Sequence, residues 1–110
     1  PLAAFLICHV TVKDDAWMAD YIQNVHSIVE KHGGKYLSRS ANITTVEGEG
    51  SGASIIALLE FPSMTALNAF VADPEYKPYA DARIAGTASS FESIDDTDAA
   101  GTIPYLTPGG

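Results

Sequence analysis

The stretch "HGGKYLSRSANITTVEG", residues 32–48, decides the fold. Its first residues have to end a helix, and the residues that follow directly are typical of a strand. Glycine can take the left-handed conformation that closes a helix, so Gly33-Gly34 marks the helix end. Residues 35–46 then predict a strand. A charged residue, Arg39, lies in the middle of this strand. Its side chain either faces water or points into a cavity, where it would bind a ligand.

The elements before this stretch are a strand and a helix. "AAFLICHVTV", residues 3–12, predicts a strand that is apolar on both faces and therefore central in its sheet. Asp14 or Asp15 can cap the helix that follows. The apolar residues of that helix recur at helical spacing, which predicts an amphipathic helix with one buried face. They include Trp17, Tyr21, Val25 and Ile28.

After the stretch, "EGEGSG" at residues 47–52 predicts a loop, and "ASIIALLEF" at residues 53–61 predicts a third strand. Pro62 stops this strand. Ser63 can cap a second helix that runs through about Ala72. This part of the chain is therefore expected to form a loop, a strand and a helix in that order.

Asp73-Pro74 breaks the second helix, and "PEYKPYADARIAG" predicts one or two short turns, since Pro78 does not fit deep inside a continuous helix. A fourth strand is expected around residues 89–94. The order β-α-β-β-α-β predicts an α+β, ferredoxin-like fold, with a four-stranded antiparallel sheet and both helices on one face. Residues 1–94 would form this domain and residues 95–110 a C-terminal tail.

The sheet face without helices carries Leu, Ile and Phe residues, which cannot be left bare in water. A second copy of the chain is the natural cover, so we expect a homodimer whose sheets face each other, a dimeric α+β barrel. The tail could wrap the partner subunit, because it contains three apolar anchors. These are Ile103, Tyr105 and Leu106.

Composition limits the class of partner. The chain has 14 acidic and 6 basic residues and a formal charge of −8, which argues against nucleic acid and anionic membranes. The single cysteine, Cys8, cannot form an internal disulfide and fits a reducing, cytoplasmic location, where we expect it to be a small buried hydrophobe. The sequence shows no signal peptide, and no apolar segment has the roughly 18 residues of a membrane span.

Three blocks carry a family resemblance: "FLICHVTVKDDAWMADYIQNV", "HGGKYLSRSANITTVEG" and "LLEFPSMTALNAFVADPEYKPYADAR". Together they resemble the bacterial family called domain of unknown function 1330, over residues 3–94. The resemblance implies a dimeric α+β barrel, similar to cofactor-free monooxygenases and muconolactone isomerases. It leaves the activity open, because one fold hosts many chemistries. Phe70, where family members often have tryptophan, and the long tail depart from the pattern.

Carried onto this chain, the resemblance singles out six residues: Tyr21, His32, Arg39, Glu60, Tyr76 and Arg83. Strand alternation places two of them among apolar neighbours, Arg39 with Leu37 and Ala41, and Glu60 with Ile56 and Leu58. An ionised group in such surroundings is costly unless it is paired. The two side chains therefore either form a structural ion pair, or bind a polar ligand in a mainly apolar cavity, with Arg39 as a fork for a carboxylate or enolate oxygen.

The histidines are weaker candidates. His9 shares a strand face with Phe5 and Ile7, so it is either a general base lining the barrel or a hydrogen-bonded core residue. His32 precedes the glycine pair, where a cation suits the negative helix end, so capping is expected first and substrate binding second. The three histidines lack tight metal spacing, and we expect no metal.

Tyr76 and Tyr79 could lid a cavity, with a phenol as proton donor or oxyanion partner, or could simply pack. Arg83 could bind substrate or merely pair with Glu75. If Pro1 is the mature terminus, its secondary amine is a candidate catalytic base or nucleophile.

Two function classes follow. The first is a small enzyme without metal or organic cofactor that transfers protons on an apolar, oxygen-bearing small molecule, by isomerisation, tautomerisation, decarboxylation or oxygenation. Arg39 would hold the substrate oxygen, and His9, Glu60 or a tyrosine such as Tyr21 would be the acid or base. The second is a non-catalytic dimeric binding or interaction module. A cavity lined by Arg39 with an acid or histidine favours the enzyme, and an Arg39–Glu60 lock in a filled barrel favours the module.

Overall fold

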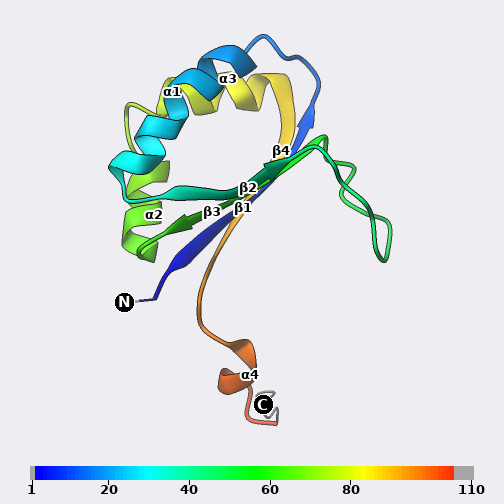
Figure 1. Ribbon diagram of the computed structural model, residues 1–110, viewed down its shortest axis with the longest axis vertical. Coiled ribbons are helices and arrows are strands. Elements are labelled where there is room, and N and C mark those ends of the chain that lie inside the picture. Colours follow the sequence, from blue (N-terminus) through cyan, green and yellow to red (C-terminus); the bar gives the residue numbers. More distant parts are fainter. Residues whose placement is uncertain (1, 106–110) are drawn as a thin grey trace.

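The computed structural model describes residues 2–105, and it contains a four-stranded antiparallel sheet in the order β2-β3-β1-β4. The elements are β1 (Ala4–Val12), α1 (Met18–Lys31), β2 (Lys35–Ser40), β3 (Ile55–Phe61), α2 (Met64–Val71), α3 (Lys77–Gly86), β4 (Thr87–Asp95) and α4 (Ala99–Thr102). Helices α1, α2 and α3 lie on the same side of the sheet (Figure 1). The predicted α+β, ferredoxin-like fold is confirmed.

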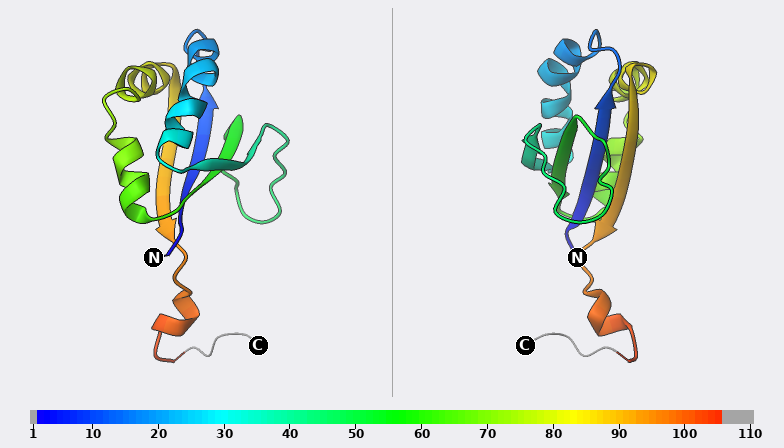
Figure 2. Two further views of the ribbon diagram at one scale, coloured as in Figure 1. Left: turned by 60° about the vertical axis from the view of Figure 1, so that its left-hand side comes forward. Right: turned by 90° about the vertical axis from the view of Figure 1, so that its right-hand side faces the viewer.

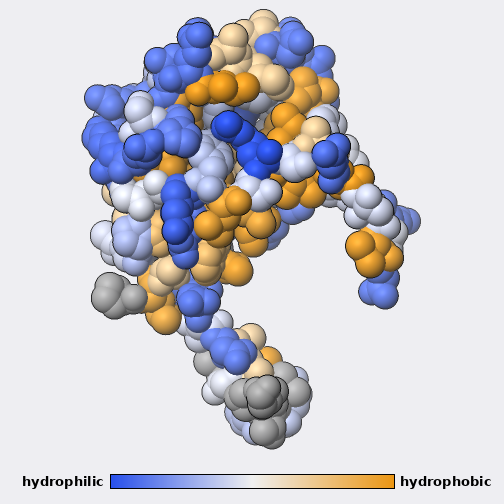
Figure 3. Space-filling model, in the orientation of Figure 1, coloured by the Kyte–Doolittle hydropathy of each residue, from blue (hydrophilic) through white to orange (hydrophobic). Residues whose placement is uncertain are grey.

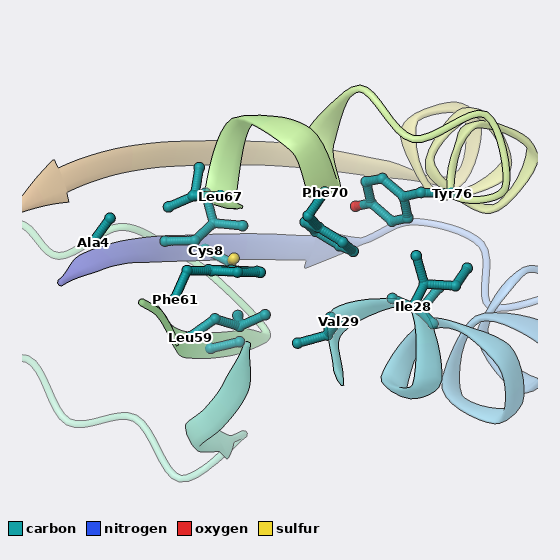
Figure 4. Close-up of a cluster of buried hydrophobic side chains, with 12 residues drawn as sticks. Ala4, Cys8, Ile28, Val29, Leu59, Phe61, Leu67, Phe70 and Tyr76 are labelled. Carbon is teal, nitrogen blue, oxygen red and sulfur yellow. The ribbon is translucent and has the colours of Figure 1, made fainter. Parts of the chain in front are cut away.

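The core lies between the sheet and these helices. Alternate residues of the central strand β1 are buried, from Ala4 at 0% exposure to Val10 at 6%, because successive side chains of a strand point to opposite faces. Aromatic and aliphatic side chains from β3 and α2 fill the space above them. Figure 4 shows Phe61 of β3 and Leu67 and Phe70 of α2 converging there.

The glycine pair ends α1 as predicted. The Gly33 N–H donates to the carbonyl of Glu30, and the Gly34 N–H donates to the carbonyl of Val29, both at 2.9 Å. This bond pair defines a Schellman motif, and Gly33 takes the left-handed conformation that the motif requires (φ 77°). Gly34 is needed for another reason, because a Cβ there would lie 2.5 Å from the ring of Phe61.

Two element boundaries differ from the prediction. Strand β2 ends at Ser40, because β3 begins only at Ile55 and Ser40 already pairs with Ile56. Residues 41–54 therefore form one exposed loop, which projects from the domain (Figure 2). Segment 77–86 is a single helix, because Pro78 lies in its first turn, where a missing N–H breaks no helical bond.

The predicted caps of α1 and α2 have different outcomes. The Ser63 hydroxyl accepts a hydrogen bond from the Ala66 N–H at 3.1 Å, so the predicted cap of α2 is confirmed. Neither Asp14 nor Asp15 caps α1, whose N-cap residue is Trp17. Asp14 instead accepts the Ala16 N–H at 2.8 Å, in the turn that precedes the helix.

A β-bulge interrupts β2 and reverses its alternation. Tyr36 pairs with Leu59 and Ser38 pairs with Leu58, so Leu37 is an extra residue with no counterpart on β3. Beyond the bulge, Arg39 pairs with Ala57, which is buried under the helices. Arg39 therefore shares the helix-facing side with Tyr36, and the prediction that it shares a face with Leu37 and Ala41 is wrong.

The opposite face of the sheet is not covered by the helices. Its apolar residues on β1, β3 and β4 remain partly accessible to solvent, with Leu58 of β3 at 38% exposure and Ile94 of β4 at 52%. Phe5 and Ile7 of the central strand share this face. Figure 3, which looks at the edge of the sheet, shows hydrophobic residues gathered over the strand region.

The C-terminal segment leaves the sheet after Asp95, one residue beyond the predicted domain end, and extends away from it (Figures 1 and 2). Asp98 caps the short α4 through the Ala100 N–H, and Tyr105 is 85% exposed. The predictions on Pro1 and Leu106 lie outside the described residues. Within residues 2–105, no helix combines the length and the apolar character that crossing a bilayer demands.

The contact of Gly34 with Phe61 gives a first prediction. Gly34→Ala should lower the free energy of unfolding by about 1–3 kcal/mol, since its Cβ overpacks the ring of a fully buried phenylalanine. The measurement is urea denaturation followed by circular dichroism. Gly101→Ala is the control, because nothing lies within 4 Å of a Cβ at that position. Equal stability of the two variants would contradict the packing argument.

Candidate active site

A cavity of about 80 Å³ lies between the sheet and the helices α1 and α3. Apolar side chains form most of its wall, including Leu6 of β1 and Leu59 of β3. The polar side chains that line it are three tyrosines and two arginines. They are Tyr21, Tyr36, Tyr76, Arg39 and Arg83. No aspartate, glutamate or histidine lines this cavity, so its fixed charge is positive.

Two tyrosine hydroxyls meet in the cavity wall. The hydroxyl of Tyr21, on α1, lies 2.8 Å from that of Tyr76, which directly precedes α3. Tyr76 is positioned by the core, because its ring packs against Phe70 at a centroid distance of 4.4 Å (Figure 4). Hydrophobic packing thus sets the place of a polar pair.

Arg83 extends this pair into a cluster of polar side chains. Its Nη2 donates to the Tyr76 hydroxyl at 3.4 Å, and its Nη1 donates to the hydroxyl of Ser89, on β4, at 2.9 Å. Tyr21, Tyr76, Arg83 and Ser89 are called the tyrosine–arginine cluster below. It joins two helical segments to the edge strand of the sheet.

The Arg83 guanidinium is buried without a counter-charge. The residue is 6% exposed, and among residues 2–105 no carboxylate pairs with it. Its Cζ lies 4.0 Å from the ring centre of Phe91 and 5.8 Å from that of Tyr21. These cation–π contacts compensate in part for the missing anion. Its Nε has no hydrogen-bond partner. An unpaired buried donor of this kind is costly, and a ligand oxygen would satisfy it.

Burial sets the protonation of two further groups. It raises the pKa of Tyr21 far above its usual value, and the neighbouring Tyr76 adds to this effect, so Tyr21 is a neutral phenol that can donate a hydrogen bond. Burial also raises the pKa of the Cys8 thiol to about 12, with partial opposition from Arg83. Cys8 is 2% exposed, which confirms the prediction of a small buried residue.

Arg39 reaches the cavity from the edge strand β2. Its guanidinium lies over the ring of Tyr36, with Cζ 4.6 Å from the ring centre. The residue is exposed, unlike Arg83, so it stands where the cavity meets solvent. It forms no ion pair within the described part of the chain.

The structure brings together four predicted residues, Tyr21, Arg39, Tyr76 and Arg83, and separates them from Glu60 and His9. Glu60 pairs in register with Phe5 on the sheet face away from the helices, and its carboxylate lies 3.2 Å from Lys35 Nζ. His9 lies on that same face, opposite Ile56. The predicted Arg39–Glu60 ion pair is therefore wrong, because the two side chains are on opposite faces.

His32 belongs to a separate cluster. Its Nε2 lies 2.7 Å from the buried carboxylate of Asp73, which also accepts a hydrogen bond from Lys31 Nζ at 2.8 Å and one from the Glu75 N–H at 2.9 Å. These contacts tie the end of α1 to the turn before α3. Tyr79 packs against the core from α3 and does not line the cavity.

Three further residues of the site were not predicted from the sequence, two in the cavity lining and one beside it. Tyr36 faces the cavity next to Arg39 only because of the bulge, and strand alternation alone puts the two on opposite faces. Trp17 is recognisable as an apolar helix residue, but its place in the cavity wall depends on how α1 packs. Ser89 becomes a partner of Arg83 through the pairing of β4 with β1, which brings it opposite Val10.

The fold and the cavity define a small ferredoxin-like α+β domain with an arginine-containing pocket between sheet and helices. The chain belongs to the family described as domain of unknown function (DUF1330), whose model matches residues 3–96. No curated protein sequence matches it.

Solved structures share the fold at low sequence identity. A protein of unknown function from Rhodopseudomonas palustris has a TM-score of 0.74 and 16% identity, over 88% of this chain and 84% of that one. SnoaB, a cofactor-independent oxygenase from Streptomyces nogalater, has a TM-score of 0.62 and 14% identity, over 89% of this chain and 96% of that one. At such identities the likeness concerns the fold alone.

The Asp73 cluster gives a prediction on acid stability. Hydrogen bonds from Lys31, His32 and the Glu75 N–H lower the pKa of Asp73, so the folded state favours its charged form. The stability that this provides is complete above the usual aspartate pKa of about 4 and is lost as the pH falls below it. Wild type should therefore exceed Asp73→Asn in stability at pH 7, and the difference should shrink steadily between pH 4 and pH 2.

The measurement is the urea midpoint of both proteins across this pH range. Glu47→Gln is the control, because it makes the same chemical change on an exposed loop residue. A difference between wild type and Asp73→Asn that grows on acidification would contradict the prediction.

Proposed function

We propose that this protein is a small, cofactor-independent enzyme that transfers protons on an apolar, oxygen-bearing small molecule. The observation that carries the proposal is the tyrosine–arginine cluster in the wall of an apolar cavity, with two hydroxyls 2.8 Å apart beside a buried guanidinium. Donors held in a site of low dielectric stabilise an oxygen that gains negative charge far better than water does.

The cluster supplies such donors from two sides. The Arg83 guanidinium and the Tyr76 hydroxyl would face the substrate oxygen on which charge develops, as in an enolate or phenolate. With no carboxylate or imidazole in the cavity lining, the groups there that carry an exchangeable proton are the tyrosine hydroxyls and the Cys8 thiol. The Tyr76 oxygen can accept a hydrogen bond from Tyr21 while the Tyr76 hydroxyl donates to the substrate oxygen, so the two phenols act together as one donor.

This chemistry fits isomerisation, tautomerisation, decarboxylation and oxygenation, because each can begin by placing charge on a substrate oxygen. The likeness to SnoaB supports oxygenation, since that protein is a cofactor-independent oxygenase with the same fold. A substrate that forms a stabilised anion can react with molecular oxygen without a metal or flavin. The protein's part is then to bind, orient and stabilise that anion.

A non-catalytic binding module is the second candidate. The observation in its favour is that Arg83 already has hydrogen bonds to Tyr76 and Ser89, so part of the cluster is satisfied without a ligand. In this case the cavity would take up small molecules without changing them. Turnover separates the two candidates.

Replacing Tyr21 tests the proposal. Tyr21→Phe should reduce turnover by about 10²–10⁴-fold, the usual contribution of a positioned proton donor. The assay follows deuterium exchange into 1,3-dicarbonyl and phenolic compounds by NMR, with oxygen uptake recorded in parallel. Tyr79→Phe is the matched control, because it removes a hydroxyl from a partly buried tyrosine outside the cavity lining.

Equal turnover of Tyr21→Phe and Tyr79→Phe would overturn the role of the cluster. Binding of these compounds with neither exchange nor oxygen uptake would favour the binding module.

We also propose that the chain acts as a homodimer whose sheets pack against each other. Leu58 and Ile94 belong to an apolar sheet face that is accessible to solvent in the monomer. Exposing such a face to water is unfavourable, and a second copy of the chain would bury it. The segment after Asp95 would lie against the partner, where the exposed ring of Tyr105 could be buried.

The dimer proposal predicts the effect of a charge at the centre of that face. Leu58→Lys should shift the protein from dimer to monomer, because a buried ammonium without a partner is costly. The measurement is sedimentation velocity at micromolar concentration. Val46→Lys is the control, because Val46 is 96% exposed in the projecting loop. A Leu58→Lys protein that stays dimeric would rule out this face as the interface.

A further inference from the structure

We infer that the ligand of the cavity carries a permanent negative charge, as a carboxylate on an apolar ring or ring-like body, and that Arg39 holds this charge at the cavity mouth. Arg83 and the two tyrosines then face the reacting oxygen, and this second part depends on the proposed function. The first part concerns binding alone. It makes Arg39 a specificity-determining residue for charged against neutral ligands.

The first argument is the pairing of positive charges. The chain has 14 acidic residues for 6 basic ones, so carboxylates are not scarce. Lys31, Lys35 and Lys77 each have a carboxylate oxygen within 3.2 Å. Among residues 2–105, neither arginine has one, nor does the exposed Lys13, but of these three residues only the two arginines line the cavity. The two unpaired arginines therefore mark a place where an anion is expected from outside.

The second argument is the bulge in β2. Without the extra Leu37, strand alternation would turn Arg39 to the opposite face of the sheet. The bulge interrupts the hydrogen-bond ladder, leaves Leu37 half exposed and points a cation at the cavity instead. Bulges commonly re-aim a side chain in this way beside active sites. The ring of Tyr36 then supports the guanidinium in its new position.

The third argument is the buried arginine. Arg83 has an Nε without a hydrogen-bond partner, although the residue is 6% exposed. Its nearest described partners are neutral hydroxyls and aromatic rings. A second cation that lacks a counter-charge raises the attraction of the same cavity for an anion, since interactions are strong where water is excluded.

A carboxylate fits this site better than a larger, more highly charged group. A guanidinium presents parallel N–H donors that match the two oxygens of a carboxylate. The mainly apolar wall suits a flat hydrocarbon body with a single charged end. The aromatic side chains of Trp17 and Tyr36 form part of the wall against which such a body would lie.

The test uses the full chain and three pairs of probes in isothermal titration calorimetry. Benzoate, 3-hydroxybenzoate and 4-hydroxybenzoate are each compared with the corresponding benzamide, which has nearly the same shape without the charge. Wild type should bind the carboxylates roughly 10- to 100-fold more tightly than the amides, the usual effect of hydrogen bonds to a charged group. Arg39→Gln should remove most of this difference by weakening the binding of the carboxylates far more than that of the amides, with Arg83 keeping a small remaining preference.

Lys13→Gln is the matched control, because it removes one exposed positive charge outside the cavity lining. It should keep the preference for carboxylates, and Arg39→Lys should keep a reduced one. Thermal unfolding of each variant checks that the exposed Arg39 can be replaced without loss of the fold.

Each outcome decides the inference. It is overturned if wild type binds acid and amide equally, if Lys13→Gln loses the preference as fully as Arg39→Gln, or if no probe binds at millimolar concentration. A preference that depends on Arg39 supports it, even if no compound is turned over. In that case the proposed reaction fails and the inferred ligand charge stands.

Discussion

The stack of Phe61, Phe70 and Tyr76 is the interaction on which the rest of the structure depends. Phe61 and Phe70 lie with ring centres 5.4 Å apart, and Phe70 and Tyr76 at 4.4 Å. At one end of the stack, the Phe61 ring packs against Gly34, between α1 and β2, and leaves no room for a Cβ at that position. The other end places the Tyr76 hydroxyl in the cavity wall, so the core positions both the central turn of the fold and the polar cluster.

The order of elements could be predicted from the sequence, because each signal is local. Gly33-Gly34 ends α1 by backbone geometry, Ser63 caps α2, and the apolar run of β1 needs cover on both faces. The length of β2 could not be predicted. The residues after Ser40 are compatible with a strand, but a strand needs a partner, and β3 begins too late to supply one.

The candidate site could be predicted in part. Tyr21, Arg39, Tyr76 and Arg83 come together, whereas Glu60 and His9 lie on the other face of the sheet. Strand alternation was correct for Glu60 and wrong for Arg39, because a bulge depends on pairing with a distant strand and shows no local pattern. The pairing of Ser89 with Arg83 is likewise a consequence of tertiary structure.

If Arg39 holds the ligand's charge as inferred above, the bulge also makes the ligand preference of this fold easy to change by mutation. Gain or loss of one codon in β2 would move Arg39 between the cavity and the opposite sheet face, without altering α1, α2 or α3. Related domains could thus acquire or lose a charged pocket in a single genetic step. The same step would place a cation on the apolar sheet face, so in the proposed homodimer a change in ligand would come with a change in how the two copies associate.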